Sequence, residues 1–128
     1  GQSVPQNPGE FVRCCLESLA LKYRKMLEDL EELRGAKLDV LHIVGGGTQN
    51  KLLSRFTADC IARPVVCGPV EGTGIGNILT QAMGLGELKN LEEIRDVVRA
   101  SFPPETLDPN AAERAKWDAA YEKFLTLS

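Results

Sequence analysis

The stretch Leu38–Leu53 constrains the fold more than any other part of this sequence. Apolar residues, several of them β-branched, hold five of the seven positions 38–44, which predicts a strand buried on both faces. Three consecutive glycines, Gly45–Gly47, follow it, and a helical pattern opens directly after them. The free N–H groups and positive dipole end of that helix would point back at the glycine turn. Such a corner suits a phosphate group or the sugar edge of a nucleotide.

The glycines match neither of the common phosphate-binding motifs. No Gly-Lys-Ser/Thr ending follows them, and they lack the spacing of the dinucleotide fingerprint. A tight turn between strand and helix that binds nothing explains the pattern equally well. From these residues alone, both interpretations stay open.

The composition is that of an ordinary acidic globular protein. The 128 residues fit one domain, with 43% hydrophobic and 26% charged residues. A net charge of −3 and a pI near 5.2 leave no basic surface for nucleic acid or an anionic membrane. The sequence has no apolar run of transmembrane length and no N-terminal signal pattern, so we expect a cytoplasmic protein. Because the first residue is Gly rather than Met, we expect a fragment or a processed form.

The four cysteines predict buried free thiols. No CxxC pair occurs and His42 is the only histidine, so a zinc site is not expected. Without a secretory signal, free thiols are the default. A Cys60–Cys67 disulfide is the alternative, and it requires Cα atoms within about 7 Å.

The first helix is marked at both ends. Asn7 as N-cap, Pro8 at the first helical position and Glu10 at the third predict its start, and Gly35 predicts its end. Helical spacing predicts its buried side, which consists of Phe11, Cys15, Leu19, Tyr23 or Met26, Leu30 and Leu33, widened to a core-facing band by Cys14, Ala20 and Leu27. The charge run 28–32 is predicted to be a solvated face.

Helices and strands alternate after it. In chain order the sequence predicts a strand at 38–44, a helix over 48–62, a strand at 64–69, a glycine-rich turn over 71–77, helices over 78–86 and 90–98, a proline-rich loop over 101–109 and a helix over 110–127. Alternation predicts parallel strand pairing. Two strands make a poor sheet, so either another chain segment completes it or the protein self-associates through exposed strand edges.

Four motifs resemble, in residues and in order, those of the FGGY carbohydrate kinases. They are CCLESLALKYR (14–24), HIVGGGTQNKLL (42–53), RPVVCGPVE (63–71) and IGNIL (75–79). The resemblance covers about 9–127 and is greatest to the rhamnulokinase branch of that family. One departure is Gly72-Thr73-Gly74, where the family often has Ala-Thr-Ala. If these positions are helical, each glycine should weaken the helix start by about 1 kcal/mol.

The resemblance implies an α/β fold. Residues 1–128 would be the C-terminal portion of an actin-like, ribonuclease-H-like ATPase domain, the second domain of the kinase, with few parallel strands flanked by helices. It implies ATP or ADP with Mg²⁺ as cofactors and transfer of the γ-phosphoryl group to L-rhamnulose. Other sugars such as L-fuculose or xylulose are alternatives, as is a non-catalytic module that dimerises through its sheet edges.

The resemblance also assigns the turn. Gly46 sits where the family's glycine approaches the nucleotide, Gly45 and Gly47 shape the turn, and Asn50 sits where an asparagine bonds the adenine. The residue pattern alone would instead leave Asn50 in solvent. The family's catalytic aspartate and most of its sugar contacts belong to the first domain. No catalytic residue and no metal ligand is therefore assigned here, and the fragment alone is expected to be inactive.

Overall fold

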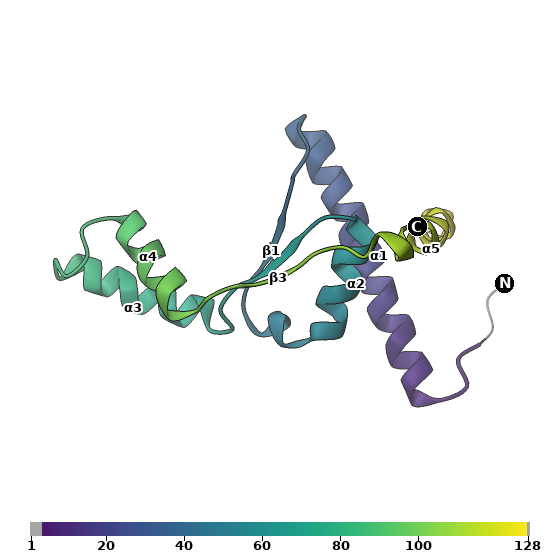
Figure 1. Ribbon diagram of the computed structural model, residues 1–128, viewed down its shortest axis with the longest axis horizontal. Coiled ribbons are helices and arrows are strands. Elements are labelled where there is room, and N and C mark those ends of the chain that lie inside the picture. Colours follow the sequence, from purple (N-terminus) through teal and green to yellow (C-terminus); the bar gives the residue numbers. More distant parts are fainter. Residues whose placement is uncertain (1–3, 128) are drawn as a thin grey trace.

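The computed structural model describes residues 4–127, which form a small sheet with helices around it (Figure 1). In chain order the elements are α1 (Pro8–Arg34), β1 (Leu41–Ile43), the 3₁₀ turn η1 (Gly46–Gln49), α2 (Lys51–Ile61), β2 (Val65–Cys67), α3 (Gly72–Gly84), α4 (Leu91–Ser101), β3 (Glu105–Leu107), the 3₁₀ turn η2 (Ala111–Glu113) and α5 (Arg114–Leu125). In Figure 1, α1 crosses the molecule as the longest helix, and α3 and α4 extend away from the sheet on the side opposite α5. The predicted α/β class is confirmed.

The sheet has the strand order β1-β2-β3. β1 and β2 are parallel, with Leu41 opposite Val65, which confirms the predicted pairing. β3 runs antiparallel to β2, with Leu107 opposite Val65. The prediction of a loop over 101–109 is wrong at residues 105–107, which form β3. The short strand depends on hydrogen bonds to a partner far away in the sequence, and no local pattern marks it.

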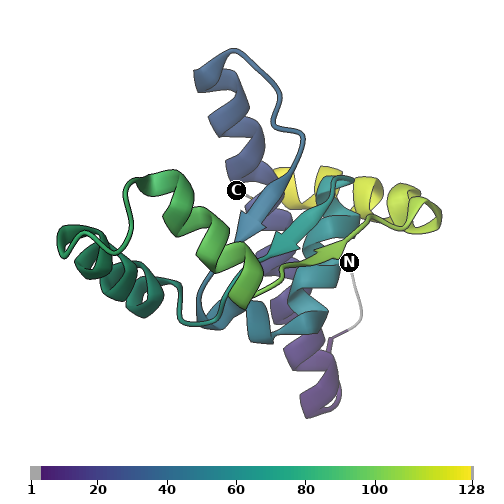
Figure 2. The same cartoon turned by 60° about the vertical axis from the view of Figure 1, so that its left-hand side comes forward.

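Helix α2 lies at the centre of the core. One cluster of buried side chains joins α1, α2 and α5 and consists of Ala20, Leu21, Phe56, Cys60, Trp117 and Tyr121. A second joins α1 and α2 to the sheet and consists of Leu27, Ala58, Ile61, Val65 and Cys67. Figure 2 shows the strands side by side with α1 and α2 behind them. The opposite face of the sheet carries His42, Val66 and Thr106 in register. His42 and Thr106, on the two outer strands, are exposed.

The predicted buried side of α1 is wrong in its main row, whereas Ala20 and Leu27, predicted at its margin, are buried as expected. Its buried residues are Ala20, Leu21, Leu27 and Glu31, because α2 packs against that face. The other face carries an apolar row at alternating spacings of four and three residues, here called the α1 stripe: Val12, Leu16, Leu19, Tyr23, Met26, Leu30 and Leu33. All but Leu16 are exposed, from 37% at Tyr23 to 85% at Leu33. Two apolar faces on one helix require two partners, and residues 4–127 supply one of them.

A buried carboxylate joins three elements at one point. Glu31 is only 5% exposed, although the charge run was predicted to be solvated. Arg63 donates to both of its carboxylate oxygens, the Leu38 N–H donates to it at 2.6 Å, and Lys37 donates at 2.9 Å. The hydrogen bonds from Arg63 and Leu38 lower the pKa of Glu31 to about 2. This clamp ties the end of α1 to the entry of β1 and the end of α2.

The glycine-rich segment 71–77 is helical rather than a turn. α3 begins at Gly72 and therefore includes Gly74 and Gly76. A Cβ added at Gly74 or Gly76 would meet no heavy atom within 4 Å, whereas one added at Gly72 would meet the Val44 Cβ at 3.8 Å. Gly72 and Gly74, which stand where the family often has alanine, therefore both lie in the helix. The predicted weakening of this helix start stays a prediction.

All four cysteines are free in the structure. Cys60 and Cys67 are buried in separate clusters, whereas Cys14 and Cys15 are exposed on α1, contrary to the expected burial. Burial raises the pKa of the Cys60 thiol to about 12, which makes it chemically inert at neutral pH. Among the described helices, none combines the length and the apolar composition needed to cross a membrane.

Candidate functional site

The glycine turn has a rigid internal frame. Gly45 has a φ of +87°, a conformation that side chains rarely adopt. Its N–H donates to the Pro69 carbonyl at 3.0 Å, and its own carbonyl accepts from the Thr48 N–H at 3.1 Å and the Thr48 hydroxyl at 2.8 Å. Thr48 is 3% exposed. Backbone conformation therefore explains glycine at position 45, and Thr48 holds the turn in shape.

Gly46 and Gly47 have no such explanation within the chain. Both are exposed, and neither has a positive φ. A Cβ built on either residue would meet no heavy atom within 4 Å. Packing and backbone strain in the described residues therefore do not require glycine at these two positions. What the missing side chains provide is a bare backbone surface that a group from outside can approach closely.

Asn50 caps helix α2. The helix was predicted to begin at Thr48 or Gln49, but η1 intervenes and α2 begins at Lys51. The Asn50 side-chain oxygen accepts the Leu53 N–H at 3.0 Å, which satisfies one free donor of the first helical turn. Within residues 4–127 no hydrogen bond is made by its side-chain amino group, and the residue is exposed. Toward a ligand, Asn50 can therefore act as a hydrogen-bond donor.

A small cavity of about 260 Å³ lies beside the turn. It is enclosed by the first turn of α2, the end of β2 and the start of β3, and its lining consists of Thr48, Gln49, Lys51, Cys67, Gly68, Val70, Pro103 and Glu105. Lys51 donates to Glu105, and this hydrogen bond raises the pKa of the lysine. None of Gly45, Gly46, Gly47 and Asn50 lines the cavity, although its wall includes the residues between them.

Sequence reasoning missed two contributors to this site. Thr48 had a local signal, since a hydroxyl three residues after a turn glycine commonly bonds back to its carbonyl. The Lys51–Glu105 pair had none, because its partners are far apart in the sequence. Neither Thr48 nor the ion pair was among the predicted site residues, which are Gly45, Gly46, Gly47 and Asn50.

Asp39 and Asp59 do not line the cavity beside the turn. Asp59 is buried and accepts the Asn110 N–H at 2.8 Å, while Asp39 is exposed beside β1. Across 4–127 no group of three or more His, Cys, Asp or Glu side chains could hold a metal ion. The site offers backbone surface, one amide donor and an ion pair. That set suits binding rather than acid–base chemistry.

The C-terminal domain of the FGGY family of carbohydrate kinases matches residues 1–85. This chain belongs to that family. The rhamnulokinase of Bacteroides thetaiotaomicron is similar to this FGGY chain at 47% identity over 124 residues, and that of Klebsiella pneumoniae subsp. pneumoniae at 45% over 123 residues. The two alignments cover 97% and 95% of this chain but 25% of each relative. The FGGY chain thus spans about a quarter of the length of these relatives.

Solved structures of FGGY kinases share the fold. The xylulose kinase from Rhodospirillum rubrum superimposes with a TM-score of 0.77 at 26% identity, over 99% of this chain and 25% of that one. The Plasmodium falciparum glycerol kinase with ADP superimposes at 0.70 and 24% identity, over 98% of this chain and 26% of that one. The predicted resemblance and fold are therefore confirmed.

Proposed function

We propose that this FGGY chain is the C-terminal part of the second domain of a sugar kinase, and that its glycine turn forms the adenosine-binding wall. The observation that carries the proposal is the exposed, sterically unexplained pair Gly46 and Gly47. A flat purine or ribose needs such a bare backbone to approach within contact distance. The N–H groups at the start of η1 lack intrahelical partners and add donors at the same surface.

Each residue of the turn has a distinct part in this proposal. Gly45 and Thr48 hold the turn in shape before any ligand arrives, so little order has to be gained on binding. Gly46 lies against the adenosine, and we now add Gly47, which the resemblance assigned to shaping the turn, because nothing in the described chain requires glycine there. Asn50 donates its amino group to a ring nitrogen of the adenine while its oxygen continues to cap α2.

For the parent protein we propose ATP-dependent phosphorylation of L-rhamnulose. Relatives named rhamnulokinases at 43–47% identity support this sugar, and the similarity to a xylulose kinase at 26% keeps xylulose as a lesser alternative. Mg²⁺ bound to the nucleotide would neutralise phosphate charge during the transfer. The described residues contain no cluster suited to hold it, so we propose that its ligands and the catalytic base belong to the first domain.

An activity assay tests the parent function. The full-length protein, given ATP, Mg²⁺ and L-rhamnulose, is expected to form ADP and sugar phosphate, with L-rhamnulose preferred over L-fuculose and xylulose. The 128-residue chain alone is expected to give no turnover, because it contributes one wall of the cleft. A full-length enzyme that prefers another sugar would refute the substrate assignment. It would not affect the proposal that the glycine turn binds the nucleotide.

Two substitutions at Asn50 separate capping from nucleotide binding. Asn50→Asp keeps the oxygen that caps α2 but removes the amino donor, so it should leave stability unchanged and weaken ADP binding about tenfold, or about 1.4 kcal/mol. Asn50→Ala should weaken binding and also cost about 1 kcal/mol of stability. Calorimetric ADP titration and thermal unfolding measure the two effects. If Asn50→Asp binds ADP as tightly as the unmodified protein, Asn50 does not contact the nucleotide.

Two uncovered surfaces support the view that the chain is part of a domain. In the described residues β1 pairs with β2 alone, so its outer edge is open, and the α1 stripe is exposed over six large side chains. We propose that further strands of the same domain pair with β1 and lie against the α1 stripe. A second candidate follows from the same surfaces, namely a module that dimerises through them.

Sedimentation distinguishes these two candidates. If further strands of the parent complete the sheet, the 128-residue chain should sediment as a loosely folded monomer or aggregate at low concentration. A tight, well-folded dimer that persists at nanomolar concentration would favour the dimerising module. Adding charge to the α1 stripe with Leu30→Glu should dissociate such a dimer, while Glu32→Gln on the same helix should not.

A further inference from the structure

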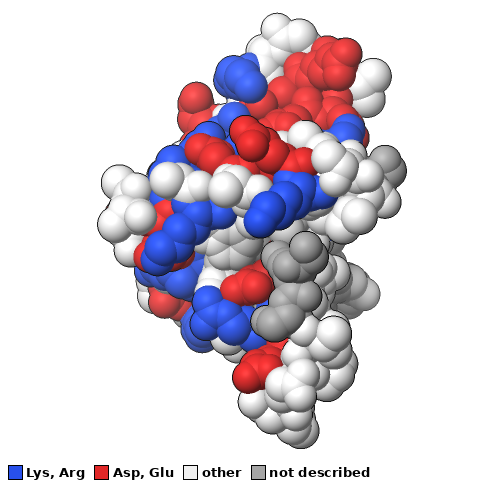
Figure 3. All heavy atoms as spheres, turned by 90° about the vertical axis from the view of Figure 1, so that its right-hand side faces the viewer, with Lys and Arg blue, Asp and Glu red and all other residues white. Residues whose placement is uncertain are grey.

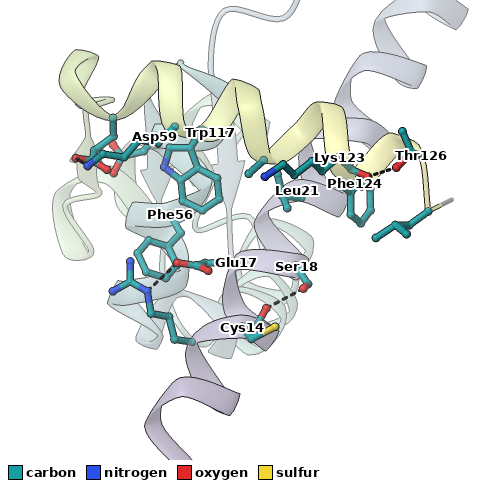
Figure 4. Close-up of a pocket in the computed structure, with 15 residues that line it drawn as sticks. Cys14, Glu17, Ser18, Leu21, Phe56, Asp59, Trp117, Lys123, Phe124 and Thr126 are labelled. Carbon is teal, nitrogen blue, oxygen red and sulfur yellow. Dashed lines mark hydrogen bonds and ion pairs between the residues drawn. The ribbon is translucent and has the colours of Figure 1, made fainter. Parts of the chain in front are cut away.

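A groove between α1 and α5 lies apart from the proposed nucleotide site and shares no lining residue with it. Its volume is about 610 Å³. In Figure 4, Phe56 and Trp117 lie at one end of the groove, Leu21, Lys123 and Phe124 at the other, and Cys14 and Ser18 on the α1 side. The Phe56 and Trp117 rings pack with centroids 5.6 Å apart. The floor is thus apolar and partly aromatic.

Four of the charged side chains around the groove are paired with one another. Arg13 bonds Glu17 at 2.7 Å, and Lys116 bonds Glu113 at 2.8 Å. Figure 3 shows this face of the molecule, where basic and acidic side chains alternate across the middle and acidic ones gather toward the top. A strongly charged ligand would gain little here. What the groove offers a partner is apolar surface inside a polar rim, the usual anatomy of a protein contact.

The chain enters α1 from the side of this groove. Asn7 caps the helix through the Glu10 N–H at 3.0 Å, and Glu10 in turn accepts the Gln6 N–H at 2.6 Å. Unlike in a capping box, the Glu10 carboxylate bonds the residue before the N-cap, and the two bonds together hold residues 6 and 7 against the first turn of α1. In both ribbon views residues 4–7, the described part of the lead-in, turn back from the start of α1 (Figures 1 and 2).

We propose that the parent segment directly preceding residue 1 lies in this groove and covers its floor with an apolar face. Three observations support this occupant: the apolar floor, the hydrogen bonds that hold residues 6 and 7 at the start of α1, and the length of the relatives, which are about four times as long as this C-terminal-domain chain. Lys123 has no ion pair among the described residues, so the occupant should bring a carboxylate to it. The proposal requires a longer parent protein but not nucleotide binding.

Two adjacent cysteines allow a direct test in the full-length protein. Both are exposed in the chain described here, but Cys14 lines the groove and Cys15 does not. In the full-length protein with a Cys15→Ser background, maleimide alkylation of Cys14 is expected to be at least tenfold slower under native conditions than after unfolding in guanidinium chloride. The buried Cys60 serves as the internal folding control, because its slow labelling reports a folded protein. Equal Cys14 rates in the native and the unfolded protein would overturn the proposal.

A photo-crosslink identifies the occupant. Benzoylphenylalanine at position 14 of the full-length protein should crosslink within roughly 30 residues upstream of residue 1, the length of a helix of about 20 residues and its connection. The same probe at position 15 should not capture that segment. A crosslink from position 14 to a distant part of the parent, or to a second molecule, would overturn the assignment. Neither readout uses ATP or turnover, so its outcome is independent of the kinase assay.

Discussion

Replacing Gly46 by valine in the full-length protein is expected to weaken ADP binding at least 100-fold, or about 2.7 kcal/mol. The valine side chain would occupy the surface on which we propose that the adenosine lies. Nothing in the described chain lies within 4 Å of a Cβ at this position, so the fold should tolerate the change. Sugar binding, which we assign mainly to the first domain, should stay measurable. Separate titrations with ADP and L-rhamnulose check both expectations.

Gly84→Val provides the matched control. Gly84 is exposed at the end of α3, and a Cβ there likewise meets no heavy atom within 4 Å. ADP affinity should be unchanged in this variant. If Gly46→Val binds ADP as tightly as the unmodified protein, the turn is an ordinary strand–helix connection. Equal losses in both variants would indicate a general defect in folding rather than a blocked site.

Replacing Glu31 by glutamine is expected to lower the melting temperature of the protein by roughly 10 °C. The carboxylate is 5% exposed and accepts hydrogen bonds from Arg63, Lys37 and the Leu38 N–H. Glutamine preserves the shape but leaves the Arg63 guanidinium without its counter-charge. Glu32→Gln, at an exposed neighbouring position, should change the melting temperature little. Thermal unfolding followed by circular dichroism measures both variants.

The same clamp predicts how stability depends on pH. Hydrogen bonds from Arg63 and Leu38 lower the pKa of Glu31 from 4.5 to about 2, so on acidification the unfolded state takes up a proton before the folded state does. The stabilisation from Glu31 is therefore complete above pH 4.5 and is lost as the pH falls from 4.5 toward 2. Stability should fall more steeply across this window in the unmodified protein than in Glu31→Gln. Parallel curves would show that the clamp contributes nothing.

Local chemistry made a large part of this fold predictable. The cap at Asn7, the end of α1 at Gly35 and the cap at Asn90 all depend on hydrogen bonds or backbone angles within a few residues, and all three are found as expected. The strand–glycine–helix pattern likewise located the turn correctly. The cap at Asn50 was missed because the turn glycines were assumed to lead straight into the helix, whereas η1 intervenes.

The candidate site was predictable only in its backbone. Gly45 to Gly47 could be identified from the residue pattern, but their separate parts were implied only by the family resemblance. Only the structure distinguishes Gly45, whose φ requires glycine, from Gly46 and Gly47, which nothing in the chain requires. The Lys51–Glu105 pair and the adjoining cavity depend on β3, a strand invisible to local pattern.

The sequence by itself determined the α/β order, the glycine turn and, through its motifs, the family. Those features rest on short-range hydrogen bonding, backbone freedom and side-chain type, all of which are written in neighbouring residues. The tertiary structure alone decided which face of α1 is buried, where β3 pairs, and that Glu31 lies inside a clamp rather than in solvent. These outcomes depend on partners distant in the chain. An apolar row such as the α1 stripe indicates that a partner exists, but its spacing carries no information about which segment that partner is.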